Sequence, residues 1–128
     1  MEKICIYNAR NDEMVFFEKY AKEFNIDLKF INEELNVESA SFAKGYEACS
    51  VQGSNVVNRK TLKVMHDNGV KYLALRSIGF NNVDKDAAKE YGIRFSNVSY
   101  STSSVAEFTV MLMMMCLRKV ESILRRTQ

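Results

Sequence analysis

The feature that most constrains the fold is a regular alternation of short apolar runs with longer, more polar segments. The apolar runs have the length and composition of buried strands and cover residues 3–7, 27–31, 48–51, 70–75 and 93–98. Helix-like segments separate them, including a short helix expected over residues 36–44 and a helix that Asn58 could cap. Glycines at 45, 69 and 92 supply stop signals. Strands alternating with helices over short connections are typical of a parallel sheet with helices on both faces. We predict an α/β fold with a doubly wound parallel sheet of about five strands.

The last part of the chain differs in kind, because it predicts one long apolar helix over residues 104–126. Ser104 and Glu107 have the spacing of a capping box, so we expect the helix to begin there. Residues 108–117 are then apolar on nearly every side. Such a helix needs cover on every side, which the preceding sheet cannot supply. We therefore expect another domain or a second subunit against residues 104–126, with a methionine-rich binding surface as the alternative.

Charge and composition exclude several kinds of partner. The chain has 128 residues and a formal net charge of +2, which is too small to indicate a nucleic acid or an anionic membrane. The basic cluster at 118–119 and 125–126 suits a helix end and lacks interleaved aromatic residues for base stacking. The longest apolar run, 110–117, is far shorter than the roughly 20 residues of a membrane span. We expect no nucleic-acid partner and no membrane partner.

The cysteines indicate a reducing environment. Cys5, Cys49 and Cys116 lie inside apolar runs without C-x-x-C spacing, so we expect three buried, free thiols and no metal site. The N-terminal residues read as a strand and not as a signal peptide. We therefore expect a cytoplasmic protein.

Two loops carry most of the candidate chemistry. Residues 76–84 follow an apolar strand and contain Gly79, two asparagines and Asp84, which we expect to cap the next helix. Ligands of open α/β sheets bind at the carboxyl ends of strands. Residues 52–55 follow another strand, and Gly53 could let successive N–H groups face an anion. A plain left-handed turn glycine is the alternative at Gly53. For Arg76 the structural alternative is an ion pair at the strand end, with Asp84 as the candidate partner.

Several short pieces together resemble one enzyme family. They are Arg-Ser-Ile-Gly at 76–79, Asn-Val-Asp at 82–84, Asn-Val at 97–98, Tyr-Ser at 100–101 and Val-Ala-Glu at 105–107. In this order and spacing they resemble the D-isomer-specific 2-hydroxyacid dehydrogenases, nearest to the D-lactate dehydrogenase branch that includes the vancomycin-resistance enzymes. The resemblance covers the whole chain but only the front part of such an enzyme.

The resemblance implies a fold, a substrate and a cofactor. Residues 1–100 would form a flavodoxin-like substrate domain, and residues 101–128 a linking and dimerisation helix that leads to a Rossmann domain. The substrate would be a small 2-oxo or 2-hydroxy acid such as pyruvate, and the cofactor NAD. By position, the loop 51–53 would hold the substrate carboxylate, residues 76–79 would form the floor of the cleft, and Tyr100 would border substrate and nicotinamide. The implied substrate-binding residues are Val51, Gln52, Gly53, Arg76, Ile78, Gly79 and Tyr100. For Tyr100, a buried hydroxyl with a hydrogen-bond partner is the alternative.

The chain lacks other parts of that chemistry. Reduction of a 2-oxo acid needs a cation at the carbonyl and an acid for the alkoxide. In the resembled family both come from later in the chain. The only histidine, His66, is expected to face solvent near a helix end, and no G-x-G-x-x-G occurs. We expect no catalytic residue, no cofactor site and no activity in this chain alone.

Two other classes of protein remain open. One is a free-standing flavodoxin-like binding or regulatory domain, although the residues after the first strand, Asn8 to Asn11, form neither a receiver's acidic cluster nor a flavin phosphate loop. The other is a small dimerisation module that uses the methionine-rich helix.

Overall fold

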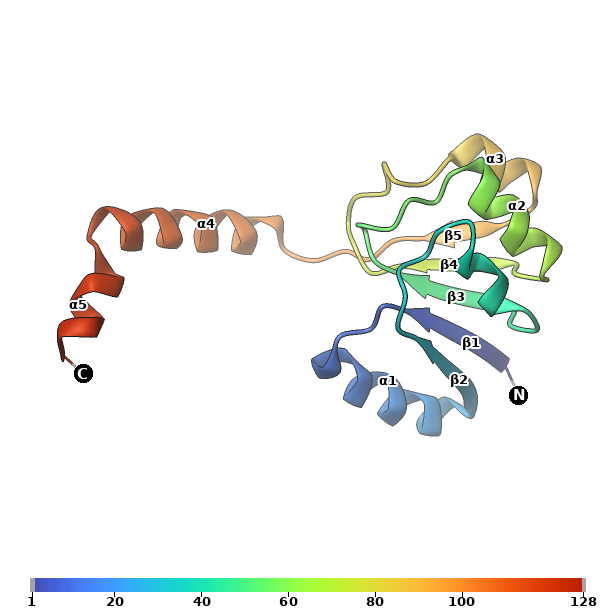
Figure 1. Ribbon diagram of the computed structural model, residues 1–128, viewed down its shortest axis with the longest axis horizontal. Coiled ribbons are helices and arrows are strands. Elements are labelled where there is room, and N and C mark those ends of the chain that lie inside the picture. Colours follow the sequence, from blue (N-terminus) through green and yellow to red (C-terminus); the bar gives the residue numbers. More distant parts are fainter. Residues whose placement is uncertain (1, 128) are drawn as a thin grey trace. The chain divides into compact units, whose positions relative to one another are not determined.

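The structure is a computed structural model that describes residues 2–127 (Figure 1). These residues form two compact units, of which the first ends at Val98 and the second begins at Ser99. The first unit contains the sheet, and the second contains two helices.

The sheet has five parallel strands, as predicted. They are β1 (Glu2–Tyr7), β2 (Ile26–Ile31), β3 (Ala48–Val51), β4 (Tyr72–Leu75) and β5 (Arg94–Ser96). Their order in the sheet is β2-β1-β3-β4-β5, and every neighbouring pair is parallel. This is the flavodoxin-like order, in which the winding reverses between β1 and β3.

Four helical segments connect the strands: α1 (Asn11–Phe24), the 3-10 helix η1 (Ser39–Ala43), α2 (Arg59–Asp67) and α3 (Lys85–Glu90). The helix predicted over residues 36–44 is only the short η1. Local side-chain bonds explain this, because Asn36 Oδ1 accepts from the N–H groups of Glu38 and Ser39. These bonds fold the backbone into a turn in place of a regular helical start.

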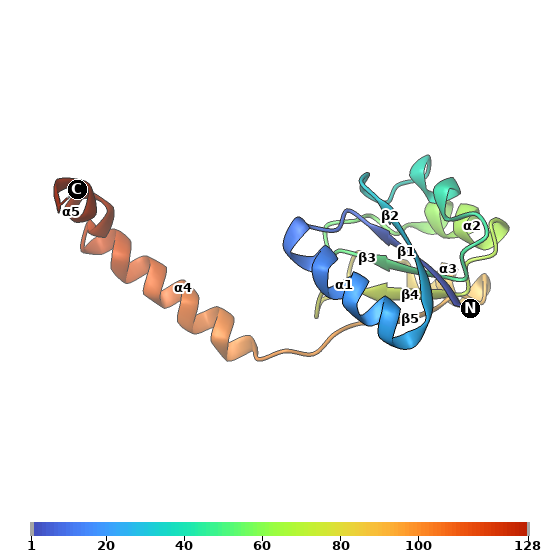
Figure 2. The ribbon, with the colours of Figure 1, turned by 90° about the horizontal axis from the view of Figure 1, so that it is seen from below.

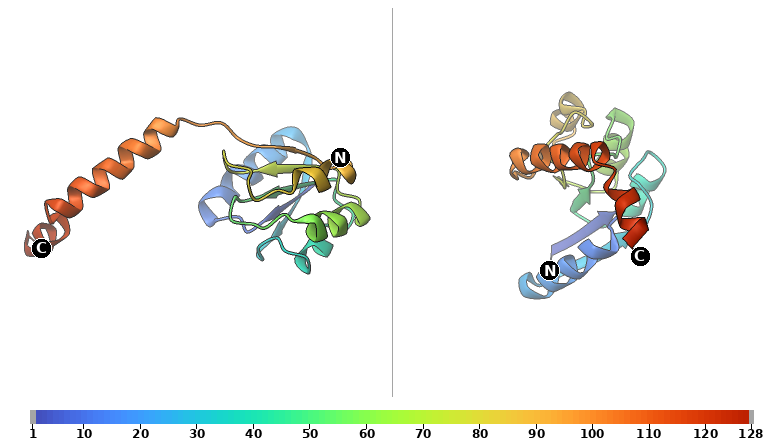
Figure 3. Two further views of the ribbon diagram at one scale, coloured as in Figure 1. Left: turned by 90° about the horizontal axis from the view of Figure 1, so that it is seen from above. Right: turned by 90° about the vertical axis from the view of Figure 1, so that its left-hand side faces the viewer.

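Helices cover the two faces of the sheet unequally. On one face, α2 and α3 lie side by side, and α2 also packs with η1 (Figures 1 and 3). The main buried cluster contains Cys5, Tyr7, Cys49, Val51, Leu62, Met65, Leu73, Leu75, Ala87 and Ala88. On the other face, α1 lies along β1 and β2 (Figure 2). Tyr72 and Ala74 on β4 and Arg94 on the edge strand β5 stay exposed.

Side-chain caps fix where α2 and α3 begin. Asn58 Oδ1 accepts from the Thr61 N–H at 3.0 Å, and Asp84 Oδ1 accepts from the Ala87 N–H at 2.9 Å. Both starts agree with the sequence prediction. Each cap therefore fixes the residue at which the loop from the preceding strand enters its helix.

The second unit contains α4 (Thr102–Leu117) and α5 (Val120–Thr127). The predicted capping box is wrong, because the N-cap is Ser101 and both Ser104 and Glu107 lie inside α4. The Ser101 hydroxyl is paired with the Ser103 hydroxyl at 2.7 Å, and it does not cap the helix.

The prediction of one continuous helix to residue 126 is also wrong. Lys119 adopts a left-handed backbone with φ of 51°, and its N–H donates to the Cys116 carbonyl. This geometry ends α4 and starts α5 in a new direction. No glycine or proline marks the break in the sequence.

The apolar side chains of α4 are exposed on all sides of the helix. The large ones are Val105, Phe108, Val110, Met111, Leu112, Met113, Met114, Met115 and Leu117. Cys116 is exposed as well, which corrects the prediction of three buried thiols. Among residues 2–127, no helix combines the length and the apolar character needed to cross a membrane.

Candidate functional site

Three loops meet where β1, β3 and β4 end, because these strands are neighbours in the sheet. Asn8 follows β1, residues 52–55 follow β3, and residues 76–80 follow β4. This edge lies at the point where the winding of the sheet reverses, where open α/β sheets bind ligands. The structure thus brings both predicted loops, and with them Val51, Gln52, Gly53, Arg76, Ile78 and Gly79, to one edge of the sheet.

Arg76 joins the ends of the three strands. Its Nη2 donates to the carbonyls of Tyr7 and Asn8 at 2.9 and 3.1 Å, and its Nη1 donates to Ser50 Oγ at 3.1 Å. These acceptors belong to β1, the residue after it, and β3. Both terminal nitrogens of the guanidinium are therefore engaged by the framework of the sheet, while its buried Nε donates no hydrogen bond among the described residues.

The ion pair of Arg76 differs from the predicted one. Its Nε lies 3.7 Å from Glu13 Oε2 on α1, while Asp84 caps α3. Only 13% of the Arg76 side chain is exposed, and burial lowers the pKa of its guanidinium. The nearby Glu13 carboxylate favours the charged form and offsets part of that effect. The structural role is confirmed, with Glu13 and not Asp84 as the partner.

The loop after β3 is held by asparagines. Asn55 Oδ1 accepts from the Gln52 N–H at 2.9 Å, and the Gln52 side chain donates to the Asn8 carbonyl at 3.1 Å. Asn82, from the loop after β4, donates to the Asn55 carbonyl at 2.8 Å. Asn55 is only 1% exposed. The loops after β3 and β4 are thus cross-linked by hydrogen bonds.

Gly53 lies where these two loops approach each other closely. It does not have a positive φ, which in this chain is confined among the described glycines to Gly45, Gly69 and Gly92. The left-handed alternative for Gly53 is therefore wrong. A Cβ built at Gly53 would lie 3.0 Å from both Cβ and Oγ of Ser77. This is tighter than nearly all Cβ contacts in proteins, so a residue with a Cβ would require Ser77 to move by a few tenths of an ångström.

Several backbone amides around this contact are unused. Within residues 2–127, the N–H groups of Gly53, Ser54, Ile78 and Gly79 donate no hydrogen bond. The carbonyls nearby are occupied, because Gly79 O accepts from the Ser77 hydroxyl and Ile78 O from the Asn97 side chain, both at 2.8 Å. Amides with no partner in two adjoining loops suit an anion such as a carboxylate.

Tyr100 and His66 are the two remaining residues singled out in the sequence, and both side chains are exposed. Tyr100 is 54% exposed, so the alternative of a buried hydroxyl is wrong. It belongs to the second unit, and its place beside substrate and nicotinamide stays a prediction. His66 is exposed in the last turn of α2, with its ring 5.7 Å from that of Tyr91. Since α2 starts near the carboxyl ends of the strands, its last turn lies toward their amino ends.

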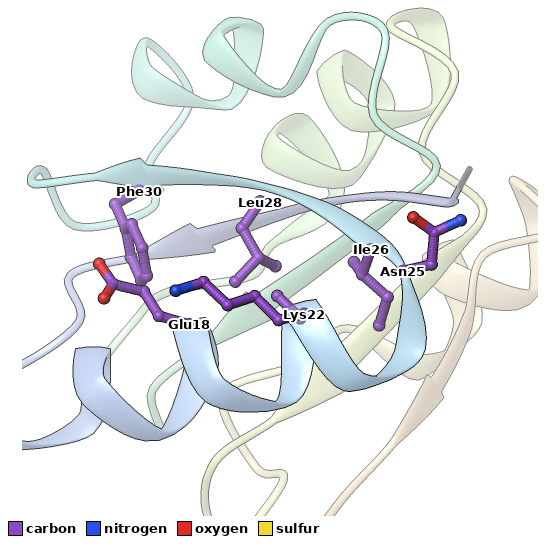
Figure 4. Close-up of a pocket in the computed structure, with 7 residues that line it drawn as sticks. Glu18, Lys22, Asn25, Ile26, Leu28 and Phe30 are labelled. Carbon is purple, nitrogen blue, oxygen red and sulfur yellow. The ribbon is translucent and has the colours of Figure 1, made fainter.

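A separate hollow of about 430 Å³ lies between α1 and β2 (Figure 4). Its lining is largely the apolar surface of β2, with Glu18 and Lys22 of α1 beside it. β2 is one of the two edge strands, and the hollow includes none of the loop residues described above. It is a gap at the side of a helix that covers the sheet, and we do not assign it a catalytic role.

The sequence placed Ser77 and Asn55 inside the two candidate loops without giving either a role of its own, and it did not place Asn8 in the site. Asn8 and Asn55 act through backbone atoms or as loop braces, which no spacing in the sequence reveals. Ser77 belongs to the Arg-Ser-Ile-Gly motif at 76–79, but the motif does not reveal which residue its side chain meets. Its contact with Gly53 depends on the pairing of β3 with β4.

The arrangement of strands and loops agrees with comparisons of the whole chain. The model of the D-isomer specific 2-hydroxyacid dehydrogenase catalytic domain matches residues 4–125. The chain belongs to this family. An aromatic 2-oxoacid reductase of Clostridium sporogenes is 40% identical over 127 residues, which are 98% of this chain and 38% of that relative.

Solved structures of family members share the fold. The apo-structure of D-lactate dehydrogenase from Escherichia coli superposes with a TM-score of 0.86 at 33% identity, over 98% of this chain and 40% of that one. An NAD-complexed D-isomer specific 2-hydroxyacid dehydrogenase from Lactobacillus delbrueckii ssp. bulgaricus gives a TM-score of 0.73 at 30% identity, over 92% of this chain and 36% of the other. The chain thus spans about two fifths of the length of the relatives that it matches.

Proposed function

We propose that this chain forms the substrate-binding part of an NAD-dependent D-2-hydroxyacid dehydrogenase that reduces a small 2-oxo acid such as pyruvate. The observation that carries the proposal is the meeting of the 52–55 and 76–80 loops at the carboxyl edge of a flavodoxin-like sheet in a member of this family. Unpartnered amides of Gly53, Ser54, Ile78 and Gly79 would receive the substrate carboxylate. Arg76 would act indirectly, by holding the strand ends in place.

The residues of this chain do not fit a dinucleotide site. The five glycines are far apart in sequence and form no G-x-G-x-x-G after a strand. Among residues 2–127, the carboxyl end of β1 is followed by Asn8, whose carbonyl is occupied by Arg76 and Gln52. NAD would therefore bind to a part of the whole protein outside this chain. We expect the chain alone to be inactive with NADH and pyruvate.

Which substituent the 2-oxo acid carries has to be found by comparing substrates directly. One relative at 40% identity is named an aromatic 2-oxoacid reductase, whereas the structure with the TM-score of 0.86 is a D-lactate dehydrogenase. Pyruvate and phenylpyruvate share the carboxylate and the ketone and differ in one substituent. Binding through loop amides would accept both, and selectivity would depend on residues around the ketone substituent.

The isolated chain offers a binding test that needs no cofactor. We would follow the backbone amide signals by NMR while titrating pyruvate, phenylpyruvate and, as a control without the 2-oxo group, propionate. Weak binding with shifts confined to Gly53, Ser54, Ile78 and Gly79 is expected. Shifts centred on the hollow between α1 and β2, or the absence of any shift at high ligand concentration, would refute the substrate role.

The activity test uses the complete reading frame. If the coding sequence continues past Gln128, the whole product should oxidise NADH with pyruvate or phenylpyruvate, while residues 1–128 should not. A complete protein that binds 2-oxo acids but never oxidises NADH would favour the flavodoxin-like binding module instead.

The second unit has its own proposed role. The apolar surface of α4, exposed on all sides, would pack against the Rossmann domain of the whole protein or against a second subunit. A dimerisation module without catalysis is the second candidate, and this same surface favours it. A cytoplasmic location stays a prediction.

A further inference from the structure

Two of the cysteines form a pair across neighbouring strands. Cys5 on β1 and Cys49 on β3 are direct partners in the parallel register. Both side chains point to the same face of the sheet, and their Sγ atoms are 3.0 Å apart. Parallel neighbours are about 4.8 Å apart, which falls within the Cα separation that a disulfide spans.

The pair lies in the centre of the core and has no other assigned role. Both residues are 0% exposed and belong to the cluster that also contains Val51 and Leu73. The only side-chain hydrogen bond of either thiol within residues 2–127 is with the other. The pair lies away from the loops proposed to bind substrate, which begin after Val51.

We propose that Cys5 and Cys49 are a dithiol that forms a reversible cross-strand disulfide with a low-molecular-weight disulfide as the oxidant. One cysteine thiolate attacks the oxidant, forming a mixed disulfide and releasing one small thiol. The second thiolate then attacks the protein sulfur of that bond and releases the other small thiol. In total, two protein thiols and one small disulfide give one protein disulfide and two small thiols.

The fold slows the formation of this disulfide but favours the disulfide at equilibrium. The hydrogen bond with Cys5, together with burial, raises the pKa of the Cys49 thiol, so little thiolate forms in the closed core. A bulky mixed disulfide also has no room between β1 and β3. Exchange therefore requires local opening and is slow. Once formed, the bond is favoured because the folded sheet already holds the two sulfurs together.

The third cysteine must be removed before the pair can be measured. Cys116 is exposed on α4 and would form disulfides between molecules. We would use the full chain with Cys116→Ser and equilibrate it in glutathione buffers of varied oxidised-to-reduced ratio. Acid quenching, alkylation and peptide mass spectrometry then give the fraction that carries the Cys5–Cys49 bond.

The decisive comparison is between the folded chain and the same chain in guanidinium chloride. By linkage, a disulfide that fits the native fold has a larger formation constant in the folded state than in the unfolded state. We expect a ratio of at least about tenfold, and a Tm for the oxidised chain at least about 5 °C above that of the reduced chain. A Cys5→Ala variant of the same chain should form no internal disulfide and show no such shift in Tm.

A formation constant no larger in the folded chain than in guanidinium chloride would overturn the proposal. So would a disulfide that forms only in denaturant and reopens on refolding in the same glutathione buffer. Either result would mean that the folded sheet holds the two cysteines as thiols and disfavours a disulfide between them.

Discussion

Single atoms decide how closely the loops after β3 and β4 approach each other. Gly53 has an ordinary negative or extended φ, yet an added Cβ would meet Ser77 at 3.0 Å. We expect Gly53→Ala to lower the free energy of unfolding by about 1–2 kcal/mol, because one loop must shift. Urea denaturation would measure it.

Gly79 provides the matched control for this change. A Cβ at Gly79 meets nothing within 4 Å, and its φ is not positive. Gly79→Ala should therefore leave the free energy of unfolding within about 0.5 kcal/mol of the original. Ser77→Gly combined with Gly53→Ala should recover part of the loss. Equal effects of the two alanine substitutions would show that the contact with Ser77 is not the cause.

Substitution of Arg76 tests whether its buried hydrogen bonds stabilise the fold. Its guanidinium donates to Tyr7, Asn8 and Ser50 and lies near Glu13. Arg76→Lys cannot reproduce these bonds and leaves buried acceptors unpaired, so we expect a loss of about 2–4 kcal/mol in unfolding free energy. Denaturant unfolding monitored by circular dichroism would test it.

Arg59 is the control for Arg76. It pairs with Glu90 while both side chains remain about half exposed. Arg59→Lys should cost less than about 0.5 kcal/mol, because solvent screens such pairs. An Arg76→Lys variant as stable as the Arg59→Lys variant would contradict a framework role.

Residue roles were predictable from the sequence only where they act locally. Asp84 and Asn58 were recognisable as caps, because a cap acts within three residues. Gly53 was recognisable as a candidate through its loop amides, but its close contact with Ser77 was not predictable, because Ser77 is 24 residues away and arrives only through strand pairing. The ion pair of Arg76 with Glu13 likewise depends on where α1 lies on the sheet.

Among the elements, the helix starts differ in how they are capped. Asp84 caps α3 with a hydrogen bond to Ala87, whereas Ser101 precedes α4 without one. We expect Asp84→Ala to lower the unfolding free energy of the first unit by about 1 kcal/mol. Thermal unfolding followed by circular dichroism would measure it.

Ser101→Ala is the matched change at the start of α4. It should leave helix content and stability nearly unchanged, since the serine hydroxyl bonds Ser103 in place of a backbone amide. Ser104→Ala should also be neutral, because Ser104 lies inside the helix. A marked loss of helix on Ser104→Ala would restore the capping box that the sequence predicted.

The strands and α-helices of the first unit were predictable, while η1 and the bounds of the helices in the second unit were not. Short apolar runs between stop signals are sufficient to locate β1 to β5. The break at Lys119 was not predictable, because Arg118 and Lys119 are both good helix formers and the turn depends on a left-handed backbone. The 3-10 turn at η1 was hidden because Asn36 and Ser39 bond to nearby backbone.

At the scale of the whole molecule, the exposed apolar surface of α4 determines how the chain behaves in solution. Val105, Phe108, Met113 and Leu117 are each more than half exposed. Contiguous apolar surface of this kind marks an interface. We therefore expect residues 1–128 to self-associate with increasing concentration in sedimentation velocity.

Lysine substitutions in two sets of three apolar residues would distinguish a specific dimer from general apolar association. Phe108, Leu112 and Met115 share one side of α4, and Val110, Met114 and Leu117 share another, since both sets follow the i, i+4, i+7 spacing. If one side forms a defined helix pair, lysine substitution of the three residues on that side should yield a monomer. Lysine substitution of the three residues on the other side should leave a discrete dimer. If both sets of substitutions reduce association equally, the surface serves a partner that the chain lacks, as expected for the cover that a Rossmann domain would provide. A chain that stays monomeric at every concentration without substitution would contradict the view that α4 is an interface at all.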